Sequence, residues 1–235
     1  VDPKLSNHHE QVAYIAYNLA EQLGLGLEDR MNVTLAGALH DIGSFYRSER
    51  LQLMDFDYNT PYLHSEMGYA LLNIMGPLQL PAEIIRFHHV PYNHGQGLEH
   101  RGQPVSLPSQ ILHLADRISV LINREEYILG QVRRITHKVR EYSGMLFNPK
   151  VVEALMELSE KESFWLDITS LSIDRLLPKR VSGHMLAVED ICDLCQLFAR
   201  IIDFRSEFTA NHSSGVANTA VKLARLSGFN EDQVQ

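Results

Sequence analysis

Cysteine is scarce in this chain, and long apolar runs are missing. Cys192 and Cys195 are the only cysteines among 235 residues, which argues against a disulfide framework and for a reducing compartment. No apolar run approaches the ~18 residues that a membrane-spanning helix requires. The N-terminal residues also lack the basic stretch followed by an apolar stretch that marks a secretory signal. We therefore expect a cytoplasmic protein that makes no membrane contact.

Clusters of basic residues are absent as well. The formal net charge is −8, which argues against binding to an extended nucleic acid. A small phosphate-ester or nucleotide substrate stays compatible with this charge, because bound divalent cations supply positive charge locally. The C-x-x-C spacing of the two cysteines is a weak redox signal, and their helix-like surroundings favour two buried thiols instead.

The apolar pattern predicts helices through almost all of the chain. Apolar residues recur every three or four positions, which is the period of an amphipathic helix, and no segment carries a β-hairpin signal. Polar stretches at 44–61 and 91–108 predict loops, and loops of such length are usually functional. The expected helices cover residues 8–23, 28–40, 62–75, 81–87, 108–129, 131–142, 149–160, 186–202 and 210–227. The predicted fold class is all-α, a helical bundle followed by a linker and additional helices.

The chain is predicted to divide into two unequal parts. Residues 1–165 form a complete domain, and residues 166–183 form a linker in which the apolar period weakens. Residues 184–235 form a shorter helical segment.

The shorter segment echoes the beginning of the chain. Residues 8–25 and 212–229 align without a gap and share histidine, valine, alanine, leucine and glycine at matching positions. This repeat predicts the start of a second, truncated copy of the first domain. The strongly apolar face of helix 186–202 needs a partner. We expect it to pack on the first domain or on another chain, which would give a homo-oligomer through the C-terminal helices.

Histidine is frequent and unevenly distributed. The chain has 12 histidines, and nine of them precede residue 114. His40 and Asp41 stand together where a predicted helix runs into Gly43, and a carboxylate beside an imidazole suits a divalent cation. Further imidazole and carboxylate groups stand in the same half of the chain, namely His8, His64, His88, His89 and Asp116.

Each of these residues also has an ordinary interpretation. The histidines could cap helices or lie in solvated loops, and Asp116 could face water. On the apolar side of its helix, however, a carboxylate is costly unless it is paired or bound to a metal. The ordered set is much harder to obtain by chance than any single member.

The order and neighbours of these residues resemble the HD superfamily of metal-dependent phosphohydrolases. The closer resemblance, over about residues 1–160, is to its HD-GYP branch, the cyclic di-GMP phosphodiesterases. The strings that carry it are HHEQVA at 8–13, LAGALHDIG at 35–43, HSEMGYALL at 64–72, the HH pair and G-Q-G at 88–97, ILHLADRISVLI at 111–122 and LFNPKVVEAL at 146–155.

The resemblance implies a site for two divalent cations, with iron, manganese, zinc, nickel or magnesium as candidates. Asp41 would bridge the two cations and is the catalytic residue that the resemblance implies. A hydroxide activated by both cations would attack phosphorus in line. Carried over by motif, the first cation would be held by His8, His40 and Asp116, and the second by His64, His88 and His89.

Three departures from the branch concern the substrate. Ser44 stands where the family has a lysine after the HD motif, so a positive donor for the phosphate is missing. Val90 stands where the family has a third, acidic residue, so a third cation is not expected. The GYP loop is degenerate but keeps Gly95 and Gly97, with Asn93 near the usual aspartate. We expect Ser44, Asn93, Gly95 and Gly97 to contact the substrate.

Three hypotheses about function remain open at this point. The first is a two-metal phosphodiesterase that acts on a phosphate ester such as cyclic di-GMP, and the intact set of ligands favours it. The second is a catalytically weak regulatory or nucleotide-sensing module, which Ser44 and the degenerate loop favour. The third is a helical interaction scaffold that binds no metal.

Overall fold

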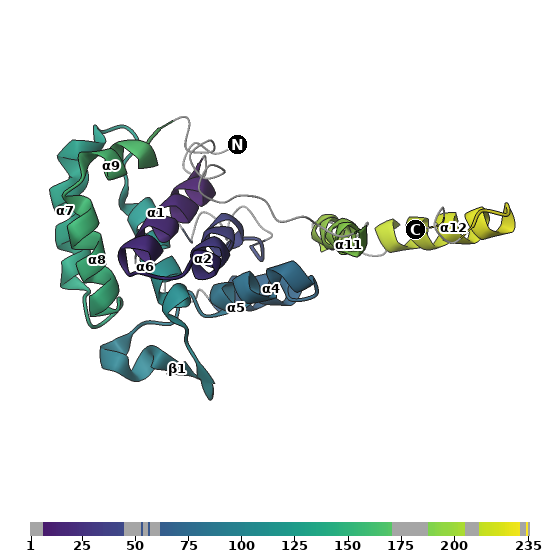
Figure 1. Cartoon of the computed structure of the whole chain (residues 1–235), viewed down its shortest axis with the longest axis horizontal. Coiled ribbons are helices and arrows are strands. Elements are labelled where there is room, and N and C mark those ends of the chain that lie inside the picture. Colours follow the sequence, from purple (N-terminus) through teal and green to yellow (C-terminus); the bar gives the residue numbers. More distant parts are fainter. Residues whose placement is uncertain are drawn as a thin grey trace.

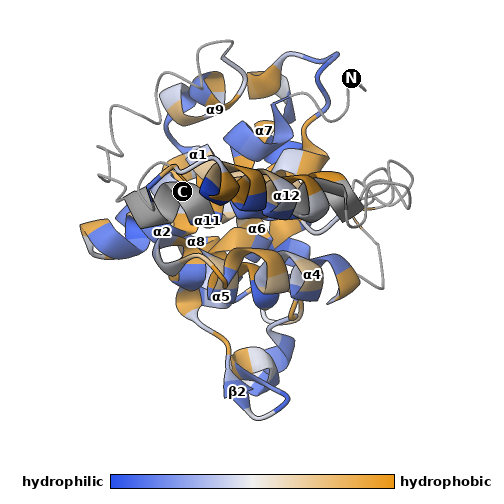
Figure 2. Ribbon diagram, turned by 90° about the vertical axis from the view of Figure 1, so that its right-hand side faces the viewer, coloured by the Kyte–Doolittle hydropathy of each residue, from blue (hydrophilic) through white to orange (hydrophobic). Residues whose placement is uncertain are grey.

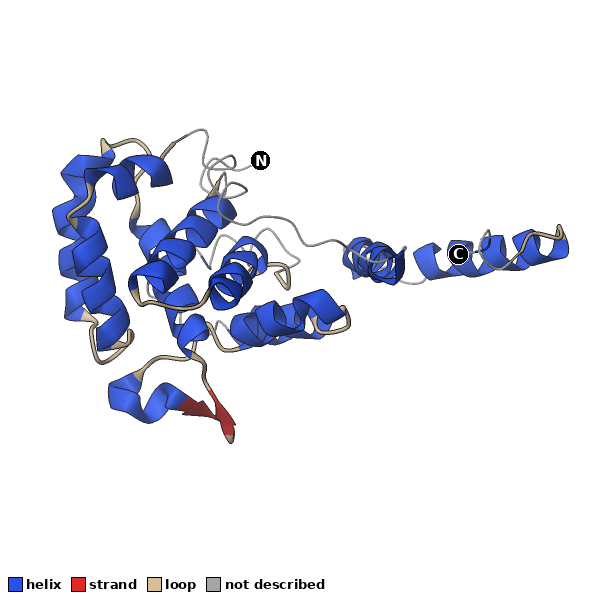
Figure 3. Ribbon diagram, in the orientation of Figure 1, coloured by secondary structure: helices blue, strands red, loops and turns tan. Residues whose placement is uncertain are grey.

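The computed structural model describes residues 7–44, 53, 56, 62–170, 188–204, 212–230 and 234. Helices dominate this part of the chain (Figure 1, Figure 3), which confirms the all-α fold class. None of the described helices is both long and apolar enough to cross a membrane. In chain order the α-helices are α1 (His8–Gln22), α2 (Leu27–Leu39), α4 (Tyr62–Leu72), α5 (Gln79–Arg86), α6 (Leu107–Leu121), α7 (Ile128–Glu141), α8 (Pro149–Ser159), α9 (Glu162–Ile168), α11 (Val188–Phe204) and α12 (His212–Leu226).

The segment predicted as a loop at 91–108 is more ordered than expected. It contains the 3-10 helix η3 (Asn93–Leu98) and a two-stranded antiparallel ribbon of β1 (Glu99–His100) and β2 (Gln103–Pro104). Strands of two residues are too short to show an alternating apolar pattern, which explains why no hairpin was predicted here. A second 3-10 turn, η2 (Gly76–Leu78), leads directly into α5.

The helices α1 and α6 form the centre of the bundle. Every residue from 11 to 20 of α1 and from 109 to 119 of α6 is buried. The first of these helices packs against α2, α6, α8 and α9. Hydrophobic segments gather where the helices meet (Figure 2). Because close-packed interiors leave little freedom to side chains, the residues that α1 and α6 present are held firmly in place.

Local capping fixes where two of the helices begin. The side chain of Ser106 accepts a hydrogen bond from the Ser109 amide at 3.2 Å, and Pro108 follows in the first turn of α6. The side chain of Asn148 accepts one from the Lys150 amide at 3.0 Å and starts α8, as predicted. Such caps satisfy amides that have no partner within the helix.

The C-terminal helices extend away from the bundle (Figure 1). Helix α11 contacts α4, and Leu197 on its inner face is only 3% exposed. This contact covers part of the apolar face of α11, whereas Phe198 and Ile202 of the predicted face stay 55% and 57% exposed. Cys195 lies on the other side of α11 and is exposed, so the expectation of a buried thiol is wrong for this residue. The side chain of Cys192 lies outside the described residues.

Helices α1 and α12 end in the same way. Each is followed by a glycine at positive φ, +73° at Gly24 and +83° at Gly228. The same pair of backbone hydrogen bonds closes both ends, which is a common way for a helix to end, and the truncated second copy stays a prediction. The amide donors and carbonyl acceptors are Gly24 to Glu21, Leu25 to Ala20, Gly228 to Arg225 and Phe229 to Ala224.

The two aligned segments differ in burial. Val12 and Leu19 of α1 are fully buried, whereas Val216 and Leu223 at the matching positions of α12 are 55% and 59% exposed. A homo-oligomer through this face stays a prediction. The division of the chain into domains also stays a prediction, although α9 continues to Ile168, past the expected boundary at residue 165.

Candidate metal centre

The residues predicted as metal ligands come together at the centre of the bundle. They enter from the first residue of α1, the end of α2, the first turn of α4, the end of α5 and the middle of α6. All of them are buried, and none is more than 7% exposed. They are His8, His40, Asp41, His64, His88, His89 and Asp116.

A first group combines two imidazoles with two carboxylates. His8 Nε2 lies 3.4 Å from Asp116 Oδ1 and 3.9 Å from Asp41 Oδ2. His40 Nε2 lies 3.4 Å from Asp41 Oδ1 and 3.7 Å from Asp116 Oδ1. Atoms that share one cation at about 2.1 Å lie roughly 3 to 3.4 Å apart. The separations are close to that value, so this group could hold a divalent cation.

A second group consists of three imidazoles. Ligand atoms of His64, His88 and His89 lie within 4.8 Å of one another, so this group too could hold a cation. Asp41 connects the two groups, because its Oδ1 is 3.8 Å from His64 Nε2 and 3.4 Å from His40 Nε2. A carboxylate in this position could bridge two cations.

Hydrogen bonds on the far side of the rings set the histidine tautomers. His40 Nδ1 donates to the Gly37 carbonyl at 2.8 Å, and His88 Nδ1 donates to the Ile85 carbonyl at 2.6 Å. A carbonyl can only accept, so Nδ1 carries the proton and Nε2 keeps its lone pair. Neutral imidazole with a free Nε2 is the form that binds metals.

With these tautomers, the Nε2 lone pairs and the carboxylate oxygens, which are all hydrogen-bond acceptors, face one another in the middle of the site. The lone pair of His40 Nε2 points at the Asp41 carboxylate 3.4 Å away, an arrangement that repels unless a cation lies between them. The Nε2 atoms of His40, His64 and His88 are buried and have no hydrogen-bond partner among the described residues. Because unsatisfied buried polar atoms are costly, the donor set fits divalent cations.

Burial and charge keep the ligands in their metal-binding forms. Burial lowers the pKa of His64 to about 4 and the pKa values of His88 and His89 well below 6.5. Burial alone would raise the pKa of Asp41, but the neighbouring His40 and His8 outweigh it and lower this pKa to about 2. At neutral pH these three histidines are therefore uncharged and Asp41 is ionised.

The two oxygens of Asp116 have different partners. Oδ1 faces His8 and His40, whereas Oδ2 accepts hydrogen bonds from Arg117 Nη2 at 2.7 Å and Nε at 3.2 Å. Burial would raise the pKa of Asp116, but the Arg117 guanidinium contributes to holding it well below its usual value. Arg117 also donates to the Leu53 carbonyl at 2.9 Å. It thus fixes which oxygen of Asp116 faces His8 and His40, while Oδ2 lies 4.0 Å from His89 Nε2.

Of the residues predicted to contact substrate, Ser44 is the one closest in sequence to a predicted ligand, because it follows Asp41 by three residues. Its side chain is fully buried, and its amide donates to the Asp41 carbonyl at 2.9 Å. This bond tightens the turn that presents Asp41. Contact between Ser44 and a substrate stays a prediction.

The other predicted substrate residues belong to η3, where the backbone explains both glycines. Gly95 has φ +92°, a conformation that favours glycine. Gly97 donates to the Tyr92 carbonyl at 2.9 Å, and the Asn93 amide donates to the Met145 carbonyl at 2.6 Å. The Asn93 bond, together with those from the Tyr92 and His94 amides, holds the start of η3 against residues 144–146. A substrate role for Asn93, Gly95 and Gly97 stays a prediction.

Several residues around the ligands were not predicted from the sequence. His113 is buried behind the cluster, with its ring centroid 5.7 Å from that of His89. Ser119 and Gln11 form a hydrogen-bonded chain behind His8, and Arg117 holds Asp116. His113 could have been found from its spacing, because it stands one helical turn before Asp116 in the same apolar string.

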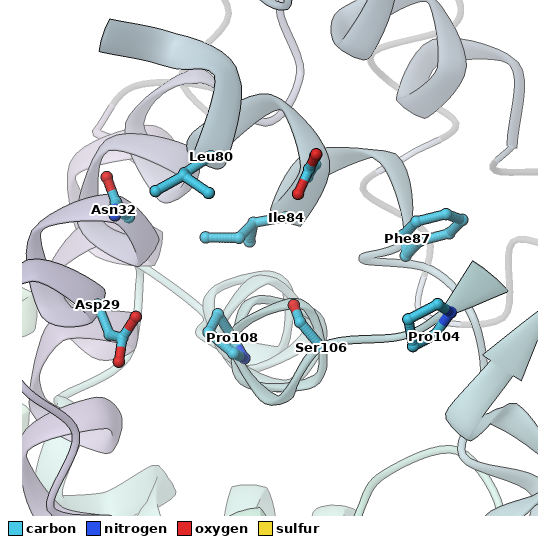
Figure 4. A pocket seen from close by; sticks show the side chains of 9 residues that line it. Asp29, Asn32, Leu80, Ile84, Phe87, Pro104, Ser106 and Pro108 are labelled. Atoms are coloured by element: carbon cyan, nitrogen blue, oxygen red, sulfur yellow. The ribbon is translucent and has the colours of Figure 1, made fainter.

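A separate cavity lies between α2, α5 and the start of α6. Its volume is about 230 Å³, and Leu80, Ile84, Phe87 and Pro108 give it apolar walls (Figure 4). Asp29 and Glu83 are its charged side chains. Two carboxylates would repel a phosphate ester, so this cavity does not suit the expected substrate.

The family comparison agrees with this geometry. The HD domain family model matches residues 5–121, a range that includes every residue of the cluster. Residues 5–121 form an HD domain. Recognition of the HD superfamily from the motifs is thereby confirmed.

Curated relatives of the HD domain chain are phosphodiesterases by name. The 3'3'-cGAMP-specific phosphodiesterase 1 of Vibrio cholerae serotype O1 is 27% identical over 237 aligned positions, covering 95% of this chain and 54% of that protein. A cyclic di-GMP phosphodiesterase of Thermotoga maritima is 28% identical over 172, covering 68% of this chain and 46% of that protein. The chain thus spans about half the length of these relatives.

A solved structure has the same fold. The crystal structure of a cyclic GMP-AMP specific phosphodiesterase of V. cholerae, V-cGAP3, aligns with a TM-score of 0.67 at 17% sequence identity. The alignment covers 97% of this chain and 62% of that chain. This likeness supports the arrangement of the helices in the HD domain and in the segment that follows it.

Proposed function

We propose that this chain is a metal-dependent phosphodiesterase that hydrolyses a cyclic dinucleotide. The observation that carries the proposal is the convergence of five buried imidazoles and two buried carboxylates from five helices. The names of the relatives, which specify cyclic GMP-AMP and cyclic di-GMP, support this substrate class.

We assign one cation to each group of ligands. His8, His40 and Asp116 would hold the first, His64, His88 and His89 would hold the second, and Asp41 would contact both. An imidazole-rich set suits iron, zinc or nickel better than magnesium, and the carboxylates also admit manganese. Two divalent cations bound there would activate water and neutralise the charge that develops on the phosphate oxygens.

The chain's own residues would contribute order and charge balance. Arg117 binds Oδ2 of Asp116 and so directs Oδ1 at His8 and His40. The carbonyls of Gly37 and Ile85 keep the Nε2 lone pairs of His40 and His88 directed at it. Ser44 provides no positive charge in place of the family lysine, so charge stabilisation during the reaction would depend mainly on the cations.

The decisive experiment measures metal content and turnover on the same preparation. Protein purified anaerobically and loaded with Mn²⁺ or Fe²⁺ is expected to contain two cations per chain. It should hydrolyse cyclic di-GMP, 3'3'-cGAMP or bis(p-nitrophenyl) phosphate. Asp41→Asn and His64→Ala should abolish turnover. His137→Ala is the matched control, because this histidine is 75% exposed on α7.

A regulatory module is the second candidate, and the buried Ser44 in place of a lysine favours it. Two bound cations per chain without turnover on any of these substrates would support this alternative. Chains without metal after anaerobic purification, in which His40→Ala changes neither stability nor activity, would overturn both candidates.

A further inference from the structure

A chain of buried hydrogen bonds leads away from His8. The Nδ1 atom of His8 lies 2.9 Å from Ser119 Oγ, and this hydroxyl donates to Gln11 Oε1 at 2.9 Å. Gln11 Nε2 in turn donates to the Ile168 carbonyl at 3.2 Å. His8, Ser119 and Gln11 are 1%, 5% and 4% exposed, so water does not compete for these bonds. This series of hydrogen bonds joins α1, α6 and the end of α9.

The donor and acceptor in each of these hydrogen bonds follow from the last acceptor, the Ile168 carbonyl. The Ile168 carbonyl can only accept, so the amide nitrogen of Gln11 must face it and Oε1 must face Ser119. The Ser119 hydroxyl then donates to Gln11 and has only lone pairs left for His8. His8 Nδ1 must therefore carry the proton, which leaves the Nε2 lone pair directed at the ligand cluster.

His8 needs such partners more than His40 and His88 do. His40 and His88 each donate to a carbonyl three residues earlier in the chain, a bond that no nearby side-chain substitution removes. Helix α1 begins at His8, so no carbonyl of the same helix precedes it. Its tautomer depends instead on the side chain of Ser119, which is 111 residues away in the sequence, and on that of Gln11, which is three residues away.

We infer that Ser119 and Gln11 are positioning residues that hold His8 in the tautomer and orientation required by a divalent cation. This inference rests on the proposed metal centre. Neither residue touches the cation or the substrate; both act through the His8 ring. Hydrogen-bond partners of metal-binding histidines typically change metal affinity about 10- to 100-fold when they are removed.

The test compares Mn²⁺ binding by the parent, Ser119→Ala and Ser119→Thr in the full chain. Ser119→Ala is expected to weaken one of the two sites about 10- to 100-fold and to leave the other unchanged. Ser119→Thr keeps the hydroxyl and should restore affinity. Ser109→Ala is the matched control, since Ser109 is equally buried on α6 but bonds Ser106. It should bind both cations as the parent does.

A second measurement reads the tautomer without metal. Long-range ¹H–¹⁵N NMR of the metal-free parent should show His8 protonated at Nδ1, and a mixture of tautomers in Ser119→Ala. Gln11→Leu removes the acceptor of the serine hydroxyl while sparing Ser119. It should weaken the same site, and it decides the question should Ser119→Ala not fold.

The outcomes separate this inference from the proposed function. Parent-like affinity at both sites in Ser119→Ala and Gln11→Leu would overturn the inference and leave the proposed function standing. A metal-free parent with His8 protonated at Nε2 would overturn it as well. A parent that binds no Mn²⁺ would refute the proposed function, while the NMR result would still establish which nitrogen of His8 carries the proton.

Discussion

Gly37 is the residue at which a single methyl group should disturb both the fold and the metal centre. It lies in α2 where this helix crosses α1. A Cβ atom at Gly37 would lie 2.8 Å from Ala13 Cα and 2.9 Å from Ala13 N. Non-bonded carbon atoms are in optimal contact at about 3.5 to 4.0 Å. Gly37→Ala would therefore push α1 and α2 apart by at least about 0.6 Å in a core that has no spare room.

Two opposing effects set the size of the change. Helix propensity alone favours alanine over glycine by about 1 kcal/mol. Overpacking a core costs about 1 to 3 kcal/mol, and the upper end applies because the obstructing atoms are the backbone of a buried helix. The expected net destabilisation is about 2 kcal/mol. For a chain of 235 residues this lowers Tm by about 4 to 8 °C.

The same substitution should affect the two groups of ligands unequally. His8 is carried by α1 and His40 follows α2, so separating these helices widens the first group. His40 Nδ1 also donates to the Gly37 carbonyl. His64 lies in α4 and His88 follows α5, and neither of these helices takes part in this crossing. Gly37→Ala should therefore weaken one Mn²⁺ site and spare the other.

Thermal unfolding of metal-free protein and Mn²⁺ titration measure both effects. Gly130→Ala on α7 is the matched control, because no atom lies within 4 Å of a Cβ added there. Propensity should dominate in this control and stabilise the protein by up to about 1 kcal/mol. A Gly37→Ala protein as stable as the parent, with both metal sites intact, would refute the reasoning.

Three further predictions concern the metal centre and its surroundings. Asp41→Asn should reduce hydrolysis of bis(p-nitrophenyl) phosphate by more than about 100-fold, since loss of a bridging ligand exceeds loss of an outer partner; residual activity near the parent's would exclude a bridging role. Removing metal with a chelator should lower Tm by about 5 to 10 °C, because a cation at 100 times its Kd stabilises by about 2.7 kcal/mol; an unchanged Tm would argue against tight binding. Burial lowers the pKa of His113 from 6.5 to about 4, so the unfolded chain binds a proton that the folded chain does not. Stability of the metal-free protein should fall as pH decreases from 6.5 to 4, with about 1.4 kcal/mol per pH unit from this group. His113→Gln should reduce that slope in urea unfolding at pH 7.0 and 5.0, and an equal slope in both proteins would contradict the prediction.

The helices and the ligands could be predicted because both depend on local sequence patterns. Amphipathic periodicity located α1, α2, α4, α6, α7 and α8, and the Asn148-Pro149 pair marked the start of α8. The ligands stand beside distinctive motifs such as His40-Asp41 and His88-His89. Their order along the chain carried the resemblance to HD domains, which residues 5–121 confirm.

The residues behind the ligands could not be predicted in this way. Ser119 meets His8 across 111 positions of sequence, and Gln11 meets Ile168 across 157. Such pairs depend on how helices are rotated against one another, which apolar periodicity does not specify. A serine or glutamine in an apolar string also carries no sign that it is bonded to a ligand. The exposure of Cys195 was missed for a related reason, because only one stripe of α11 is covered by its neighbours.

The two groups of ligands differ in charge, and this difference bears on how each would bind its cation. The first group contains Asp41 and Asp116, although Arg117 compensates part of the charge on Asp116. The second group contains three imidazoles that burial keeps neutral, so its attraction for a cation depends on ring lone pairs and on Oδ1 of Asp41. Carboxylates suit hard cations, whereas imidazoles suit iron, zinc and nickel. The second group therefore restricts the choice of metal more than the first does, and Oδ1 of Asp41 is the oxygen that lies beside both groups.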